Sequence, residues 1–435
     1  MRIALVAPQS SSPRSRDAGG PGQRVSSLAE ALGGLGHQVT VYAPKDSPAL
    51  PGKTTLAPGV TVEHLPAGPR GRKSGDEAPV DIPAFSDQLA RRWRQNPPDI
   101  AHAHFWTSGL AALAGSRGLN LPVVQTFHSL GMLPRGSGPS RGSGPAGRPP
   151  PRSPGAAHAR GRQPGTGHHL ARVRLEICLA RNASAVLATS SEQMTKLATL
   201  GVPRASMRVV PWGVDTGRFA PEGPVAKRNG QPRLLAVRQS AADDGLDIVI
   251  RALAEVPGAE LVIAGGPSGS GPNADPANQD LARLARDLGV ADRITFTGDV
   301  SRTHLPALLR SADLLVSGAW EDPFGTVALQ AMACGTPVAA SAEGAVGDAV
   351  IDGTTGILVP PGQPSALARR IRHLLASPLQ LDAFSVAAVD RARSRYSWDR
   401  IGRETVRAYE RCLPHLVPAV KDEPEPEDAD SSQEG

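Results

Sequence analysis

The chain has 435 residues, of which 40% are apolar and 20% are charged, and its formal net charge is +6. This length exceeds what one hydrophobic core supports, so we expect two domains with an ordinary globular composition. No run approaches the roughly 20 apolar residues that a membrane span needs, and three cysteines give no paired disulfide framework, which favours a reducing, cytoplasmic setting.

The charge is unevenly distributed along the chain. The segment from Arg135 to Arg174 holds eight arginines and no acid, whereas Asp422 to Glu434 holds seven acids. The basic segment has neither interleaved aromatics nor helical periodicity, so we interpret it as a solvated loop. We therefore expect no nucleic-acid partner, while the arginines allow peripheral contact with an anionic membrane.

The first half of the chain alternates apolar strands with amphipathic helices. This alternation predicts a parallel sheet that is covered by helices on both faces. The expected strands are residues 1–7, 37–43, 61–66, 99–105, 121–128, 184–190 and 207–213, and the expected helices are residues 24–35, 86–95, 170–182 and 191–201.

The same rhythm restarts near Arg233. It predicts a second α/β unit, and two stacked Rossmann-like domains with parallel sheets that face a central cleft. The expected strands are residues 233–237, 259–265, 293–298, 312–318 and 336–341, followed by amphipathic helices at residues 365–377 and 399–413.

Several residues stand where a ligand would meet the ends of such strands. The glycine-rich run 17–22, which contains Gly20, lets backbone amides approach an anion closely. His128 ends a buried strand and so faces the predicted crevice. His102 and His104 share one strand face; with no third ligand nearby we favour structural histidines over a metal pair, and expect no metal site. The segment Val209–Phe219 leaves the first domain through proline and glycine and is a predicted interdomain hinge.

The segment Glu321–Ala340 carries the most information. It predicts a Pro-Phe-Gly turn that opens a helix, a Cys-Gly stop and then a buried strand. The free amides and the dipole at a helix N-terminus attract phosphate oxygens, so this layout suits a sugar nucleotide.

Four blocks of sequence together resemble the bacterial family-four retaining glycosyltransferases. They lie at residues 19–41, 99–131, 209–219 and 321–361, and the resemblance extends over nearly all of residues 1–413. It implies a GT-B fold in which the C-terminal domain holds the donor nucleotide and the N-terminal domain holds the acceptor. It also implies a last helix that crosses back to the first domain. We accordingly predict an N-terminal domain at 1–215 with a disordered insertion at 134–169, a C-terminal domain at 216–395, a returning helix at 396–413 and a disordered acidic tail at 418–435.

The resemblance also assigns roles to individual residues. Gly20 falls on the loop that closes over the donor diphosphate, and His128 falls on a histidine that contacts the donor sugar. Phe324, Gly325 and Thr326 supply the turn whose amides meet sugar and phosphate. Retaining transfer in this family uses no protein nucleophile; the leaving β-phosphate helps to deprotonate the acceptor hydroxyl.

The donor site departs from the family pattern. The family carries an arginine and a lysine after the first strand of the second domain, where they clamp the diphosphate. Here Gln239 stands at the arginine position and Asp244 at the lysine position, although a one-residue shift would let Arg238 serve as the arginine. The two family glutamates, one contacting the donor sugar and one the ribose, are replaced by Asp322, with Glu321 adjacent, and by Gln330.

Three hypotheses follow. The first is an active retaining glycosyltransferase that moves a sugar from a nucleotide-diphosphate sugar to a hydroxyl acceptor, with no other cofactor and with His128, Asp322 and Glu321 as catalytic residues. The second is a catalytically weakened paralogue that acts by binding, as a regulatory partner of an active transferase. A third is another GT-B enzyme acting on sugar nucleotides, such as an epimerase.

Overall fold

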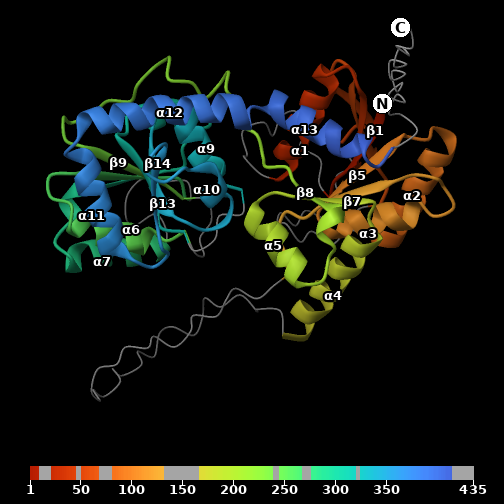
Figure 1. Ribbon diagram of the computed structural model, residues 1–435, viewed down its shortest axis with the longest axis horizontal. Helices are drawn as coiled ribbons and strands as arrows, with labels where there is room; N and C mark the ends of the chain where they lie inside the picture. Colours follow the sequence, from red (N-terminus) through yellow and green to blue (C-terminus); the bar gives the residue numbers. More distant parts are fainter. Residues whose placement is uncertain are drawn as a thin grey trace, which may run out of the picture.

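The computed structural model shows two α/β domains side by side, joined by two chain crossings (Figure 1). The predicted acidic tail lies outside the described residues, and so does the predicted insertion except for its last four positions, with which a helix begins at Thr166. The structure describes residues 1–8, 21–45, 50–67, 81–131, 166–238, 244–266, 276–319 and 324–413.

The first domain is built on an 8-stranded sheet in the order β3-β4-β2-β1-β5-β6-β7-β8. The predicted parallel sheet is confirmed, but the sequence analysis missed one strand: Lys53–Ala57 forms an edge strand that runs antiparallel to its neighbour. Its residues are mostly exposed or half-buried and include little apolar surface, so the apolar pattern that marks the other strands is missing there. The strands are β1 (Arg2–Val6), β2 (Gln38–Pro44), β3 (Lys53–Ala57), β4 (Val60–Leu65), β5 (Ile100–His104), β6 (Val123–Thr126), β7 (Ala185–Ala188) and β8 (Met207–Val209).

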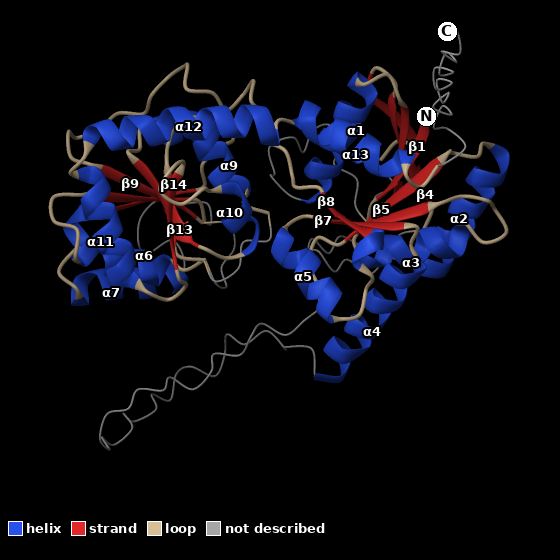
Figure 2. Cartoon of the chain, viewed as in Figure 1, coloured by secondary structure: helices blue, strands red, loops and turns tan. Residues whose placement is uncertain are grey.

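Helices cover this sheet (Figure 2) because each presents an apolar stripe to it. In α2, Phe85, Leu89 and Trp93 recur every four residues and are fully buried, while the Asp81 carboxylate caps the helix by accepting from the Ala84 amide. The helices are α1 (Pro21–Gly34), α2 (Ile82–Gln95), α3 (Trp106–Gly115), α4 (Thr166–Asn182) and α5 (Ser191–Thr199).

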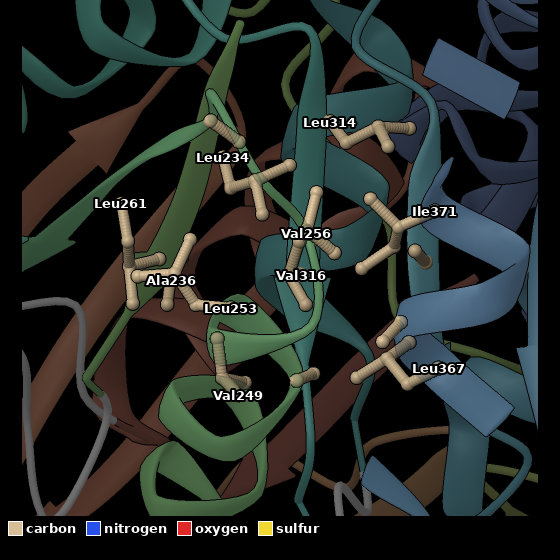
Figure 3. Close-up of a cluster of buried hydrophobic side chains, with 14 of the residues drawn as sticks. Leu234, Ala236, Val249, Leu253, Val256, Leu261, Leu314, Val316, Leu367 and Ile371 are labelled. Atoms are coloured by element: carbon tan, nitrogen blue, oxygen red, sulfur yellow. The ribbon is translucent and has the colours of Figure 1, made fainter. Parts of the chain in front are cut away.

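The second domain has a 6-stranded parallel sheet in the order β11-β10-β9-β12-β13-β14. Figure 3 shows side chains of its strands packing against those of α6 and α11, among them Leu234, Leu253 and Ile371. The elements are β9 (Arg233–Val237), α6 (Leu246–Ala254), β10 (Glu260–Ala264), α7 (Pro276–Asp287), β11 (Ile294–Gly298), α8 (Leu305–Arg310), β12 (Leu314–Ser317), α9 (Thr326–Ala333), β13 (Val338–Ser341), α10 (Gly344–Ala349), β14 (Gly356–Val359), α11 (Pro364–Leu375) and α12 (Pro378–Tyr396).

The chain crosses between the domains at two places that lie together. The first crossing follows β8 and the second follows α12, and the Val214 amide donates to the Tyr396 carbonyl at 2.8 Å where they meet. After the second crossing, α13 (Trp398–Glu410) packs against α1 of the first domain. Its Ile401 and Tyr409 belong to the core of that domain, so the end of the chain completes the first domain.

Among the residues that the structure describes, no helix has both the length and the apolar composition for crossing a membrane.

Candidate functional site

The first sheet has a topological switch point beside β1. Strand β1 pairs with β2 on one side and with β5 on the other, and in a doubly wound sheet ligands bind beyond the strand ends at such a switch point. His104 ends β5, and Phe105 follows it with a φ of +70°, a conformation that costs a non-glycine residue about 1–3 kcal/mol. Strain of this kind concentrates at functional sites, and here it lies at the carboxyl end of β5, next to the switch point.

Three buried histidines lie on β5 and just after β6. Both ring nitrogens of His102 are hydrogen-bonded: Nδ1 to the Tyr409 hydroxyl at 2.7 Å and Nε2 to the Thr126 hydroxyl at 2.9 Å. His102 therefore acts as a structural residue. His128 Nε2 lies 3.3 Å from His104 Nδ1. Burial lowers the pKa of all three, that of His104 to about 3, and all three rings are therefore neutral near pH 7. In the described part of the chain, no three His, Cys, Asp or Glu side chains are grouped so that they could hold a metal ion.

An aromatic cluster joins the histidines to the second domain. Phe105 stacks on His128 with ring centroids 3.7 Å apart. Trp212, from the first crossing, lies 5.1 Å from His128 and 6.0 Å from Trp398, and Phe324 of the second domain lies 6.0 Å from His128. Residues from both domains and from both crossings thus meet around His128, at the boundary between the domains.

The N-terminus of α9 meets this cluster. Gly325 precedes the helix with a φ of +59°, and a Cβ there would lie 3.3 Å from the Ala345 carbonyl carbon, so the turn requires glycine. Thr326 is the first helical residue. From the first domain, the Arg24 guanidinium carbon lies 3.7 Å from the centroid of the Phe324 ring, and Arg24 Nη2 donates to Thr326 Oγ1 at 3.4 Å. Four predicted residues, His128 and Phe324 to Thr326, are therefore in one place.

The second sheet has its own switch point beside α9. Strand β9 pairs with β10 on one side and with β12 on the other, and the loops after β9 and β12 touch closely. A Cβ on Gly245 would lie 2.1 Å from the carbonyl carbon of Gly318, so only glycine allows this approach. The described donor candidates Arg238 and Asp244 after β9, and Phe324 after β12, therefore belong to one edge of the sheet.

Arg238 and Asp244 form an ion pair at that edge. The Arg238 Nε lies 3.5 Å from Asp244 Oδ2, and Arg238 Nη1 donates to Asn278 Oδ1 at 2.8 Å. The Arg238 side chain is only 4% exposed. Burial raises the pKa of Asp244, and the Leu246 amide and Arg238 oppose that rise. Asp244, which we expected at the position of the family lysine, thus partly neutralises the arginine next to it.

The remaining predicted site residues divide into two groups. Gln330 lies on α9, one turn beyond Thr326, and is buried at 9% exposure. Gly20, Gln239, Glu321 and Asp322 lie outside the described residues, so their predicted roles stay predictions.

The two domains also cap each other's helices. The Glu192 carboxylate at the start of α5 accepts from the Gly344 amide at the start of α10, and the Asp348 carboxylate accepts from the Ser191 amide at 2.6 Å. Each acid thereby satisfies a free amide at the positive end of the helix across the boundary. Figure 1 shows α5 and α10 on the two sides of that boundary. The Tyr396 hydroxyl donates to the Asp348 carbonyl, which ties α10 to the crossing.

Sequence reasoning missed three residues of this region. Arg24 was included only in a predicted helix, Trp212 only in a predicted hinge, and Asn278 in no motif. Trp212 offered a signal, because a large aromatic in a Pro-Gly hinge needs a packing partner. Arg24 and Asn278 offered none, since each acquires its contacts through folding alone.

Comparison with known families divides the chain as the two sheets do. Residues 19–213 match the family described as "Glycosyl transferase 4-like domain", and residues 222–391 match the family described as "Glycosyl transferases group 1".

Curated relatives match over nearly the whole chain. D-inositol 3-phosphate glycosyltransferase 2 of Catenulispora acidiphila is 32% identical over 95% of this chain and 96% of its own length. The D-inositol 3-phosphate glycosyltransferase of Frankia alni is 31% identical over 94% and 98%. Among solved structures, sucrose-phosphate synthase of Thermosynechococcus elongatus superposes with a TM-score of 0.75 at 25% identity, covering 95% of this chain and 99% of that one.

Proposed function

The chain belongs to the family-four glycosyltransferases of GT-B fold, enzymes that use nucleotide sugars, and we propose that it transfers the sugar to an acceptor hydroxyl with retention of configuration. The observation that carries this proposal is the meeting of the Phe324–Gly325–Thr326 turn with His128 between the domains. A helix N-terminus suited to phosphate then lies close to a histidine whose Nδ1 is unpaired among the described residues.

His128 suits a contact with the sugar. Its Nε2 is next to His104, while its buried Nδ1 has no hydrogen-bond partner among the described residues. A buried polar atom without a partner is costly, and a sugar hydroxyl would satisfy it. Since burial lowers the pKa of His128, the ring stays neutral and can either accept or donate one hydrogen bond.

The chemistry is then a substitution at the anomeric carbon. The acceptor oxygen forms a bond to that carbon on the face from which the diphosphate departs, and the hydroxyl proton passes to a phosphate oxygen of the leaving group. The amides at the N-terminus of α9 stabilise the negative charge that develops on the diphosphate. No protein nucleophile is needed for this route.

We propose an inositol phosphate as the acceptor class. The support is that two relatives, similar to this chain over both domains, are D-inositol 3-phosphate glycosyltransferases. The same names favour transfer over a purely regulatory role, and over epimerisation.

The first test is ligand binding and turnover. Thermal shift and calorimetry with UDP, GDP and ADP should show stabilisation of the protein by at least one nucleoside diphosphate. Incubation of the corresponding sugar nucleotides with inositol 3-phosphate should then yield a glycoside, whose anomeric configuration proton NMR reads directly.

The outcomes separate the hypotheses. If none of the three diphosphates binds at millimolar concentration, the transferase proposal fails. Binding without transfer to any acceptor would favour the regulatory paralogue, and a product with inverted configuration would contradict the retaining mechanism.

A further inference from the structure

His104 is a fully buried histidine that the proposed chemistry does not yet use. It ends β5, and its Nδ1 lies 3.3 Å from Nε2 of His128, within hydrogen-bond distance. The two rings are steeply inclined to each other, with an interplanar angle of 69°. The other nitrogen of each ring, Nε2 of His104 and Nδ1 of His128, is buried and has no hydrogen-bond partner among the described residues. The two histidines therefore form a pair with one inner contact and two outer nitrogens.

The inner contact of this pair can hold only one hydrogen. Burial lowers the pKa of both rings, so each ring is neutral near pH 7 and carries a single N–H. If His128 Nε2 donates to His104 Nδ1, then His128 Nδ1 is a bare acceptor and His104 Nε2 carries the other hydrogen. If His104 Nδ1 donates instead, both outer nitrogens change character. One outer nitrogen is thus always a donor and the other an acceptor.

The chemistry of the imidazole ring favours the first arrangement. A neutral histidine side chain intrinsically prefers its hydrogen on Nε2, and in the first arrangement both rings have it there. In the alternative both rings would carry it on Nδ1, so the preference counts twice. Phe105 stacks on His128 with ring centroids 3.7 Å apart and an interplanar angle of 11°, which holds the ring in the plane where Nε2 meets His104. The pair then presents a bare Nδ1 on His128.

We propose that His104 is a positioning residue: it accepts from His128 Nε2 and so fixes His128 as the tautomer whose Nδ1 accepts a hydrogen bond from a hydroxyl of the donor sugar. The inference rests on the proposed function. The hydrogen bond at one ring nitrogen sets the character of the other. A sugar hydroxyl has a hydrogen to donate, so it satisfies a buried acceptor that has no partner among the described residues. Without His104, the His128 ring would exchange between two tautomers, of which only one accepts.

Two substitutions of His104 separate its inner nitrogen from its outer one. In His104→Asn the side-chain amide stands close to the place of Nδ1 and can accept from His128, whereas in His104→Gln it reaches the place of Nε2 instead. ¹⁵N NMR of the histidine-labelled protein near pH 7 reads the tautomer of each ring, and the His128 signals are those that His128→Gln lacks. We expect the Nε2–H form of His128 in the wild type and in His104→Asn, and shifts averaged over both tautomers in His104→Gln.

Ligand binding shows whether this tautomer matters for the sugar. Calorimetry compares UDP, GDP and ADP with their glucose and N-acetylglucosamine conjugates, so that the ratio of the two affinities reports the contacts of the sugar. His104→Gln should shift this ratio against the conjugate by about 3-fold to 10-fold, the typical effect of one hydrogen bond, and His104→Asn should keep most of the wild-type value. Neither variant should change the affinity for the free diphosphate.

His102→Gln is the matched control, since it makes the same change two residues earlier on the same strand. The His102 ring is also buried, and its centroid lies 4.2 Å from that of His104, yet its hydrogen bonds go to Tyr409 and Thr126. This variant should leave both the tautomer of His128 and the affinity ratio as they are in the wild type.

Three results would overturn the inference while leaving the proposed function intact. They are an Nδ1–H form of His128 in the wild type, an unchanged tautomer and ratio in His104→Gln, and an equal loss in His102→Gln. If His104→Gln does not fold, the wild-type spectrum decides, because an Nδ1–H form excludes the proposed contact. A wild type that binds a free diphosphate but none of the conjugates also contradicts the sugar contact. If the wild type binds no diphosphate at all, the proposed function fails first and the inference fails with it.

Discussion

Three histidines, His102, His104 and His128, lie in one cluster, yet they differ in their hydrogen bonds and therefore in their roles. Both nitrogens of His102 are hydrogen-bonded, so it stabilises the sheet. His104 and His128 each keep one buried nitrogen without a partner among the described residues. The satisfied ring contacts Tyr409 of α13, whereas we place the donor sugar next to His128.

These histidines make stability depend on pH. Burial lowers their pKa in the folded state, so the unfolded chain takes up protons first as the pH falls below 6.5. The stability they contribute is complete above that value and is lost progressively toward the folded pKa, about 3 for His104. Each histidine should lower the free energy of unfolding by about 1.4 kcal/mol for every unit by which the pH falls within this range. In His104→Asn we expect the slope to fall by about that amount, as measured by urea unfolding between pH 6 and pH 4.

Val124→Ala is the control for this experiment. It removes buried volume from the neighbouring strand but no titratable group, so it should lower stability by the same amount at every pH. An unchanged slope in His104→Asn would mean that His104 does not remain neutral in the folded protein.

At the residue scale, the features that could be predicted from the sequence are those formed by residues close together in the chain. The turn at Gly325 and Thr326 could be predicted, because the glycine, the apolar helix and the strand that follows all lie within twenty residues. Arg24 could not, because its contact with Thr326 joins positions 302 apart in the chain. The pairing of Arg238 with Asp244 was missed for a related reason: the motif placed both residues against phosphate, and the geometry directs them toward each other.

Helices α5 and α10 show how two short elements can hold two domains together. Neither helix would be stable alone, and each begins at the boundary with its free amides directed across it. The acids that receive these amides, Glu192 and Asp348, lie on the opposite helix. The two contacts therefore form or break together when the cleft opens.

We expect the double variant Glu192→Gln with Asp348→Asn to open the cleft. Replacing each carboxylate by an amide keeps the shape but removes the charge, at a cost of about 1 kcal/mol per contact because both are partly exposed. Small-angle scattering of the ligand-free protein should show a larger radius of gyration than in the wild type.

The Glu192 side chain also pairs with Lys196 at 2.8 Å, so Lys196→Met provides the control. It removes that ion pair but leaves both caps in place, and its scattering curve should match the wild type. A double variant as compact as the wild type would show that the caps do not govern closure.

Element prediction succeeded where a strand or helix buries one regular face and failed where it does not. The apolar spacing along α2 and α13 marks both helices in the sequence. Strand β3 lies at an edge and is largely exposed, so its residues carry no such pattern. Its antiparallel direction follows from the tight connection to β4, which is too short for a crossover.

At the scale of the whole molecule, α13, the last helix of the described chain, packs against α1, the first. Gly402 faces α1, where an added Cβ would lie 3.2 Å from Leu35 and 3.3 Å from Ala31. Tyr409 of the same helix reaches His102 in the sheet. The first domain therefore depends on residues that follow the second.

Gly402→Leu should destabilise the protein by forcing α13 away from α1. We expect a loss of about 1–3 kcal/mol, the usual cost of overpacking, although leucine favours helix more than glycine does. Differential scanning calorimetry should show the loss as a lower unfolding temperature.

Arg403→Leu places the same side chain one residue later on the exposed face, so it should leave the unfolding temperature close to that of the wild type. A Gly402→Leu protein as stable as Arg403→Leu would mean that α13 is only loosely attached.

The position of α13 also sets the order in which the protein can mature on the ribosome. The last strand of the first sheet ends at Val209, but the helix that completes that domain begins at Trp398, roughly 190 residues later. At synthesis rates of about 5–20 residues per second, this interval lasts on the order of 10–40 s. During that time the surface of α1 that α13 will cover is open to other contacts, and the second domain is made in full, with its last helix α12 ending at Tyr396, just before α13 begins. The part of the protein made first is thus finished last.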